Sequence, residues 1–334
     1  MVDRLYCYVQ KSVNPYENLA LEAFFTSNVQ PNEVILYLWQ NKNTVVIGKN
    51  QNPWKECRLR ELEQNSGVLS RRLSGGGAVF HDMGNLNFTF IAANENYSIP
   101  KQMQVVLKAV QSFGVNAELS GRNDITADGK KFSGNAFYNN GTNSYHHGTL
   151  LVNADMEKLS AYLNVSASKL SGKGVDSVKS RVTNLNALCG DITIETIKSA
   201  LKKAFGEEYG FSVEAFPSER LDEKEIAVLK EKFSSWDWCF GRKIPFDYRI
   251  EHRFSWGEAE LQLAVDGGKI KNAALYSDAM EWRGFSEIAE KLKGCEFSAK
   301  AVAECLQSIA NGIDDKHRLA ILNDLKERIL QEDF

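Results

Sequence analysis

The chain has 334 residues, of which 43% are hydrophobic and 25% are charged, and its formal net charge is −3 at pH 7. This composition is ordinary for a globular protein, and the length suffices for one large domain and one smaller domain. The negative charge argues against general nucleic-acid binding. The N-terminus has no apolar segment of the kind that forms a targeting signal, and no run of about 18 apolar residues indicates a membrane span. We therefore expect a cytoplasmic protein that binds neither nucleic acid nor a membrane.

The six cysteines are scattered along the sequence and form no CxxC pair. This spacing predicts neither a zinc site nor a set of disulfides, and favours small buried hydrophobic residues in a reducing compartment.

The first elements expected are a helix and two strands. Asn14 and Pro15 are typical of a helix start, and apolar residues at helical spacing follow as far as Phe24. Residues 34–39 and 44–47 are apolar and strand-like, with a polar turn at 41–43 between them. The simplest interpretation of these two runs is a hairpin.

The segment 71–90 contains three consecutive glycines, Gly75, Gly76 and Gly77, preceded by two arginines and followed by strand-like residues. Because glycine has no Cβ, such a turn can direct successive N–H groups at one acceptor, and the arginines add positive charge. We expect the ligand to be a phosphate that carries an acyl or nucleotide group. A β-bulge or a flexible turn is the alternative, since neither standard phosphate-binding fingerprint is present.

The next part predicts a helix through 103–110 and then a hairpin at Asp128 and Gly129, with strands over 124–127 and 130–138. On the second strand, alternation places Lys131, Ser133 and Asn135 on one face, and Phe132 and Ala136 on the other. Helices and strands in this order predict an α+β fold.

The remaining pattern predicts a turn at Asn140 and Gly141, a strand at 149–152, and helices at 155–163, 193–205 and 222–233. The segment 168–186 is rich in glycine and basic residues, and forms either a flexible loop above a cleft or a solvated surface loop. Trp236 and Trp238 are expected to pack in the wall of the large domain. Strands over 254–265 and from 270 onward, a turn at 266–269 and two helices then predict a small α+β domain. The expected domains are 1–248 and 249–334.

Seven blocks of sequence resemble the lipoate-protein ligases of the bacterial type that carry a C-terminal accessory domain. They are QNPWKEC at 51–57, RRLSGGGAVFHDMGN at 71–85, GRND at 121–124, KKFSGNAF at 130–137, HHGTLL at 146–151, GVDSVKSRVTNL at 174–185 and SWDW at 235–238. The resemblance implies a catalytic domain over 1–248, with the mixed sheet and flanking helices of biotin and lipoate ligases, and an accessory domain over 249–334.

The reaction that the resemblance implies uses ATP and Mg²⁺ in two steps. Lipoate, with octanoate as a further candidate, is converted to its adenylate with release of pyrophosphate. The acyl group is then transferred to a lysine of a lipoyl-carrier domain, in the E2 subunits of 2-oxoacid dehydrogenases or in the glycine cleavage H protein. A monomer is expected.

The resemblance also implies roles for individual residues. Lys131 matches the lysine that contacts both the acyl carbonyl and the phosphate, a role that suits a compact charge on a flexible stem. The nucleotide contacts implied or expected are Arg72, Gly77, Ala78, Val79, Phe80, Asn123, Asp124 and Lys131. The expected acyl contacts are Ser74, Gly75, Gly76, His81 and Lys131.

Several of these roles have structural alternatives. Asp124 is a candidate magnesium ligand, but with Asn123 it could instead form an Asx turn. His81 could be a structural histidine, and Arg71 a surface charge at a strand edge. Val79, Phe88 and residues 35–47 are candidates for an acyl pocket, and the segment 168–185 for a lid that excludes water from the adenylate.

Three other functions are alternatives. An ATP-independent octanoyl or lipoyl transferase would use a cysteine nucleophile, but no cysteine lies between Cys57 and Cys189. A biotin ligase would carry a different glycine-rich loop. A non-catalytic binder of lipoate or nucleotide would keep the site without turnover, yet Lys131 is present.

Overall fold

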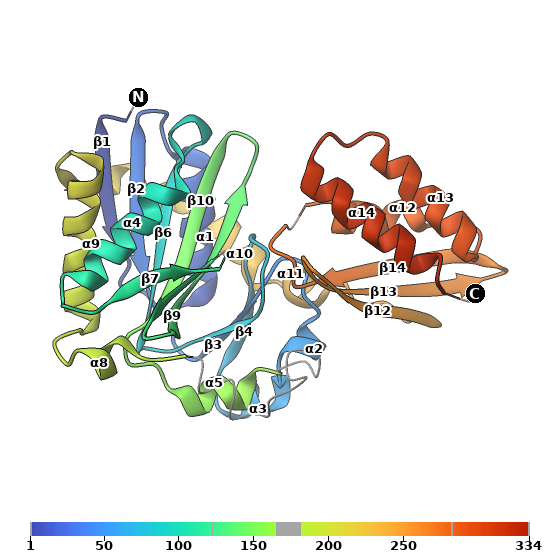
Figure 1. The fold of residues 1–334 in the computed structure, drawn as a ribbon, viewed down its shortest axis with the longest axis horizontal. Coiled ribbons are helices and arrows are strands. Elements are labelled where there is room, and N and C mark those ends of the chain that lie inside the picture. The colour runs from blue at the N-terminus through green and yellow to red at the C-terminus, as the bar shows by residue number, and fades with distance from the viewer. Residues whose placement is uncertain (1, 122, 165–181, 282, 333–334) are drawn as a thin grey trace. The chain divides into compact units, whose positions relative to one another are not determined.

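A computed structural model describes the chain except for residues 1, 122, 165–181, 282 and 333–334 (Figure 1). Most of the basic segment proposed as a lid therefore lies outside the described residues. The chain divides into two compact units: the first unit contains residues 1–46, 56–71 and 79–239, and the second unit contains residues 47–55, 72–78 and 240–334. The assignment of a catalytic domain to 1–248 and an accessory domain to 249–334 stays a prediction.

A mixed sheet forms the centre of the first unit. Its eight strands among the described residues follow the order β11-β1-β2-β6-β10-β9-β8-β7. They are β1 (Arg4–Val9), β2 (Glu33–Trp39), β6 (Asn85–Ala93), β7 (Ala117–Ser120), β8 (Asp124–Ala127), β9 (Lys130–Asn139), β10 (Asn143–Leu151) and β11 (Val213–Ala215). β1 is parallel to β2 and β11, and the other neighbours are antiparallel. The expected α+β class is confirmed.

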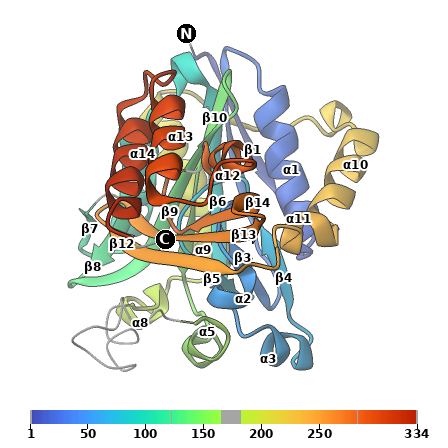
Figure 2. The same ribbon diagram turned by 90° about the vertical axis from the view of Figure 1, so that its right-hand side faces the viewer.

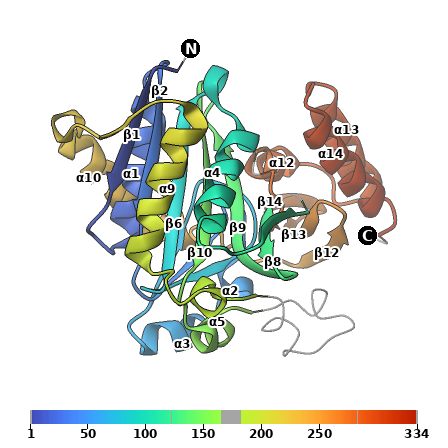
Figure 3. The ribbon, with the colours of Figure 1, turned by 60° about the vertical axis from the view of Figure 1, so that its left-hand side comes forward.

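Two pairs of helices cover the sheet. Helix α1 (Pro15–Asn28) packs with α10 (Glu223–Ser234), and α4 (Ile99–Gln111) packs with α9 (Ile194–Tyr209). Figures 1 and 3 show the α4–α9 pair on one face and the α1–α10 pair on the other. Phe90 of β6 and Phe205 of α9 meet in the core, with ring centroids 5.7 Å apart. These helices agree with the periodicity of the sequence.

Local signals explain where several elements begin and turn. The Asn14 side chain accepts hydrogen bonds from the backbone N–H groups of Tyr16 and Glu17, which confirms the predicted start of α1. Asp128 and Gly129 have φ values of 51° and 71°, as a two-residue hairpin turn with the twist of the flanking strands requires. The predicted hairpin between β8 and β9 is therefore confirmed.

The hairpin expected from residues 34–39 and 44–47 is wrong. β2 lies between β1 and β6, so both of its edges are already paired and every residue in it is buried. β3 (Thr44–Ile47) instead lies between β4 (Val68–Arg71) and β5 (Val79–His81) in a separate three-stranded sheet. Asn43, with a φ of 47°, lies where the chain passes from one sheet to the other. Two adjacent apolar runs reveal strands but not their partners.

Short elements connect these parts. They are α2 (Pro53–Glu56), α3 (Leu59–Gln64), the 3₁₀ turn Asn94–Asn96, α5 (Met156–Tyr162), α8 (Leu185–Leu188), the 3₁₀ turn Ser218–Arg220 and α11 (Trp236–Phe240). Among the described residues, no helix combines the length and the apolar character that a membrane span would need.

In the second unit, a three-stranded antiparallel sheet packs against helices (Figure 2). The strands are β12 (Tyr248–Phe254), β13 (Gly257–Asp266) and β14 (Lys269–Ser277), and the helices are α12 (Phe285–Leu292), α13 (Ala299–Ala310) and α14 (Lys316–Ile329). The turn at Gly267 and Gly268 is confirmed, with positive φ at both residues. Most of the predicted strand over 254–265 corresponds to β13, whereas its first residue, Phe254, ends β12. The sequence indicated two helices after these strands, and the described residues form three.

Candidate active site

The glycine turn belongs to the second unit, and the Arg72 side chain holds its shape. The guanidinium of Arg72 donates from Nη2 to the carbonyl oxygens of Gly75 (2.7 Å) and Gly77 (2.8 Å), and from Nε to Ser74 Oγ (3.1 Å). Arg72 and Ser74 are both buried. The arginine therefore binds carbonyl groups of the turn, and its expected contact with a nucleotide stays a prediction.

The turn also comes very close to other backbone segments of the same unit. A Cβ at Gly48 would lie 2.3 Å from the carbonyl oxygen of Gly76, and a Cβ at Gly75 would lie 2.4 Å from that of Ala279. Gly76 has a φ of 88°, and its N–H donates to the Ala279 oxygen at 2.9 Å. Glycine is therefore required here by packing against protein backbone, in addition to any ligand.

We expect Gly48→Ala to lower the free energy of unfolding by about 1–3 kcal/mol, because the added methyl group would displace the carbonyl of Gly76. Urea unfolding measures this effect. Gly190→Ala is the matched control, since a Cβ there meets no described heavy atom within 4 Å. Equal stability of the two variants would contradict the prediction.

Residues of β5, in the first unit, follow the glycine turn. The Phe80 ring is buried and packs against Tyr162, with centroids 5.3 Å apart. His81 is also buried, and its Nδ1 lies 3.1 Å from Nδ2 of Asn41. Val79 is half-buried and pairs with Val46 of β3. Their roles toward nucleotide and acyl group stay predictions.

Lys131 and Asp124 form an ion pair in the first unit. Lys131 Nζ lies 2.7 Å from Asp124 Oδ1, and the two side chains are 37% and 36% exposed. Asp124 begins β8, and Lys131 follows the Asp128–Gly129 turn on β9. Where β8 and β9 shift register, Thr126 pairs with Lys131 and Ile125 pairs with Ser133, so the buried Phe132 is the extra residue of a β-bulge. A cationic side chain is thus held near the surface, where an anionic substrate could replace Asp124 as the partner of Lys131.

The loop that carries Asn123 is fixed to β9 by a pair of amide side chains. Asn123 Nδ2 donates to the carbonyl oxygen of Asn135 (2.9 Å), and Asn135 Nδ2 donates to that of Asn123 (3.0 Å). His146 of β10 lies behind this pair, with its Nε2 2.8 Å from Asn135 Oδ1. Because Oδ1 is an acceptor, we assign the proton of the neutral ring to Nε2. His146 therefore positions Asn135, a role that the adjacent histidines in the sequence did not reveal.

His146 is buried among the rings of Phe88, Phe90 and Phe137. Burial, with a smaller contribution from His147, lowers the pKa of His146 from 6.5 to about 3. The ring is therefore neutral in the folded protein at neutral pH, as its role as a single-proton donor requires.

This shift predicts that the protein becomes less stable as the pH falls from about 6.5 toward 3. In that window the unfolded chain binds a proton at His146 that the folded chain does not bind, so acid favours unfolding. Urea unfolding at several pH values would measure the slope. His146→Gln keeps an N–H donor without titrating, and we expect a shallower slope for it. An identical slope would show that other groups cause the acid sensitivity.

Arg71 is not the surface charge that the sequence allowed as an alternative. Its side chain is only 2% exposed and donates to the carbonyl oxygens of Trp238 (3.0 Å) and Cys239 (2.6 Å) in α11. Trp238 Nε1 donates in return to the Arg71 carbonyl oxygen (2.8 Å). Trp236, in contrast, is 60% exposed, so only one of the two indoles packs as expected.

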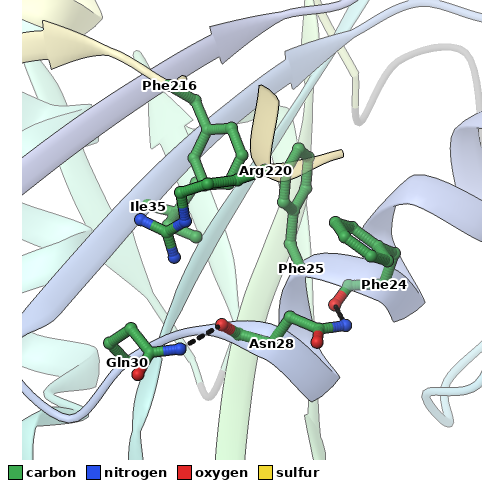
Figure 4. A pocket seen from close by; sticks show the side chains of 7 residues that line it. All are labelled: Phe24, Phe25, Asn28, Gln30, Ile35, Phe216 and Arg220. Atoms are coloured by element: carbon green, nitrogen blue, oxygen red, sulfur yellow. Dashed lines mark hydrogen bonds between the residues drawn. The ribbon is translucent and has the colours of Figure 1, made fainter. Parts of the chain in front are cut away.

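One cavity of the first unit has a volume of about 160 Å³ (Figure 4). Its lining residues are Phe24, Phe25, Asn28, Gln30, Ile35, Phe216 and Arg220. Ile35 falls in the range 35–47 considered for an acyl pocket, but none of the residues expected to contact nucleotide or acyl group lines this cavity. Phe88 lies in the core of the first unit.

The predicted site residues thus fall into two groups. The first unit brings Lys131 next to Asp124 and joins Asn123 to Asn135, and it also contains Val79, Phe80 and His81. The second unit brings together Arg72, Ser74, Gly75 and Gly77, with Gly76 and Ala78 in the same segment.

Two family models match the chain. The lipoyl protein ligase A/B catalytic domain matches residues 14–206, and the bacterial lipoate protein ligase C-terminus matches residues 243–327. A curated relative, lipoate-protein ligase A of Blochmanniella floridana, is 40% identical over an alignment of 306 residues, and the match covers 89% of this chain and 90% of the relative.

Two solved structures are similar as well. P. falciparum LipL1 in complex with lipoate is 29% identical with a TM-score of 0.83, and the match covers 98% of this chain and 100% of that one. A lipoate-protein ligase A bound with ATP is 26% identical with a TM-score of 0.61, over 72% of this chain and 99% of that one. With a catalytic-domain model that matches more than half of its length and a curated relative that matches nearly all of it, the chain belongs to the lipoate-protein ligase family.

Proposed function

We propose that this ligase activates free lipoate and attaches it to carrier proteins in two steps. The lipoate carboxylate attacks the α-phosphate of ATP, forming lipoyl-AMP and releasing pyrophosphate. The amine of a carrier lysine then attacks the acyl carbon, which forms the amide and releases AMP. The expected carriers are the lipoyl domains of E2 subunits and the glycine cleavage H protein. The relatives in complex with lipoate and with ATP support both substrates.

The observation that carries the proposal is the half-exposed ion pair of Lys131 and Asp124. Attack of one anion on another requires positive charge where negative charge develops, and preorganised groups of this kind contribute substantially to rate. We propose that Lys131 leaves Asp124 to contact the acyl carbonyl and the α-phosphate. The N–H groups of the segment 77–80, with Arg72, would contact the nucleotide, and Ser74, Gly75, Gly76 and His81 the acyl group.

The proposed magnesium ion would have to share its ligands with ATP. Among the described residues, no group of three His, Cys, Asp or Glu side chains gathers that could hold a metal ion. The single Asp124 carboxylate fits Mg²⁺, which commonly binds one or two carboxylates together with substrate phosphates. Such an ion would neutralise phosphate charge, while Asn123 would orient the loop that bears the carboxylate.

The three buried cysteines do not favour a cysteine-dependent transferase. Cys7, Cys57 and Cys239 are buried, and burial raises the pKa of all three, that of Cys57 to about 12. Since the thiolate is the nucleophile in such transferases, these groups are poorly suited to the role. We also propose a monomeric, cytoplasmic protein, which gel filtration and cell fractionation would test.

Pyrophosphate release with ATP, Mg²⁺ and either lipoate, octanoate or biotin tests the proposed function. We expect release with lipoate, and a mass increase of the carrier domain by one lipoyl group once that domain is added. A transferase would modify the carrier from an acylated donor without ATP. A non-catalytic binder would retain ligand without releasing pyrophosphate, and either result would overturn the proposal.

A further inference from the structure

Two cysteines of the second unit lie beside each other at the end of α12. Cys305 Sγ lies 3.3 Å from the carbonyl oxygen of Lys291, and Cys295 Sγ lies 3.6 Å from the same oxygen. Carbonyl groups in the last turn of a helix have no partner within the helix, so this oxygen is available to both thiols. Two sulfur atoms that share one acceptor are near neighbours, although ten positions separate the cysteines in the sequence.

The surroundings hold both residues in place while leaving them partly accessible. The backbone of Cys295 is bound on both sides, since its N–H donates to Leu292 and its carbonyl oxygen accepts from Ile270. Cys305 lies within α13, which packs against α12. Both cysteines are half-buried at the edge of the hydrophobic core of this unit.

None of the other four cysteines is both half-buried and part of the second unit. Cys7, Cys57 and Cys239 are buried, and Cys189, although half-buried, belongs to the first unit. Burial, followed by the hydrogen bond and charge of Cys295, raises the pKa of Cys305 to about 11, which again indicates that the two thiols interact.

We propose that Cys295 and Cys305 form a dithiol site that reacts with small disulfides of the glutathione class and closes to an intramolecular disulfide. One thiolate attacks the small disulfide, forming a mixed disulfide and releasing one thiolate of the reagent. The second protein thiol loses its proton and attacks the protein sulfur of that bond, which releases the second reagent thiolate. The protein loses two hydrogens and two electrons, and the reagent is reduced to two thiols.

The test treats the full-length reduced protein with oxidised glutathione, followed by alkylation and peptide mass mapping. We expect a disulfide-linked pair of peptides that contains Cys295 and Cys305, reversible by dithiothreitol. In Cys305→Ser the glutathione should remain on Cys295, and in Cys295→Ser it should remain on Cys305, because the resolving thiol is missing. Cys189 serves as the control that retains a mixed disulfide. Stable glutathione on both cysteines of the unmodified sequence would overturn the proposal.

A second measurement covers the case of slow exchange. Phenylarsine oxide binds stably only where two thiols lie close enough to share its arsenic atom. We expect the protein to bind it through Cys295 and Cys305, and either serine variant to lose that binding. If the unmodified protein does not bind the arsenical through these two thiols, or if the serine variants bind it equally well, the two sulfur atoms do not form a dithiol site.

Discussion

Lys131→Ala is expected to reduce the rate of lipoyl-AMP formation by about 10²-fold or more, because it removes the positive charge proposed for the reacting carboxylate and phosphate. The fold should be retained, since the side chain is 37% exposed and its ion pair is with the partly exposed Asp124. Pyrophosphate release in the presence of ATP, Mg²⁺ and lipoate measures the rate, and urea unfolding checks the fold.

The neighbouring Lys130→Ala is the matched control for charge. Lys130 is exposed at the start of the same strand, so its removal changes the net charge equally, and we expect near-normal rates. Lys131→Arg would keep the charge but replace a compact ammonium with a planar, bulkier group, and should recover little activity. If Lys131→Ala releases pyrophosphate as fast as Lys130→Ala, the proposed role of Lys131 is wrong.

Arg71→Ala is expected to cause the largest loss of stability, about 3 kcal/mol or more in the free energy of unfolding. The substitution removes the charge-assisted hydrogen bonds to Trp238 and Cys239, and leaves their carbonyl groups without these donors. Arg71→Lys should recover only part of the loss, since one ammonium lacks the forked geometry that reaches both carbonyl groups. Chemical unfolding of the full chain measures both variants.

Arg58→Ala provides the comparison on the surface. Arg58 is exposed and donates from Nε to Asn164 at 3.1 Å, so its loss should change stability by no more than about 0.5 kcal/mol. A similar small effect for Arg71→Ala would mean that α11 tolerates separation from β4, contrary to the packing described for Arg71.

The parts of the fold that could be predicted depend on local chemistry. The N-cap Asn14, followed by Pro15, marked the start of α1. The pair Asp128–Gly129, which adopts positive φ, marked the β8–β9 turn. Both signals act between residues close in sequence, so the sequence alone contains the cause. The turn also places Lys131 and Asp124 on neighbouring strands, but their ion pair depends in addition on the register shift at Phe132, which the sequence did not reveal.

The parts that could not be predicted depend on contacts between distant residues. The residues near β2 did not indicate that both of its edges would be paired. The residues near Arg71 did not indicate its hydrogen bond to Trp238 of α11, which lies 167 positions later in the sequence. The positioning role of His146 likewise requires Asn135 on a neighbouring strand. In each case the partner is chosen by the tertiary structure, so the residue itself carries no signal of it.

Because residues 47–55 and 72–78 belong to the second unit, a single cut near residue 248 does not separate the two units of this enzyme. A protein truncated after residue 248 would keep both loops but lack residues that bind them. Lys55 would lose its ion pairs with Glu251 and Glu258, and the N–H of Gly76 would lose the carbonyl oxygen of Ala279. Separate production of residues 1–248 and 249–334 would therefore leave both loops without these partners.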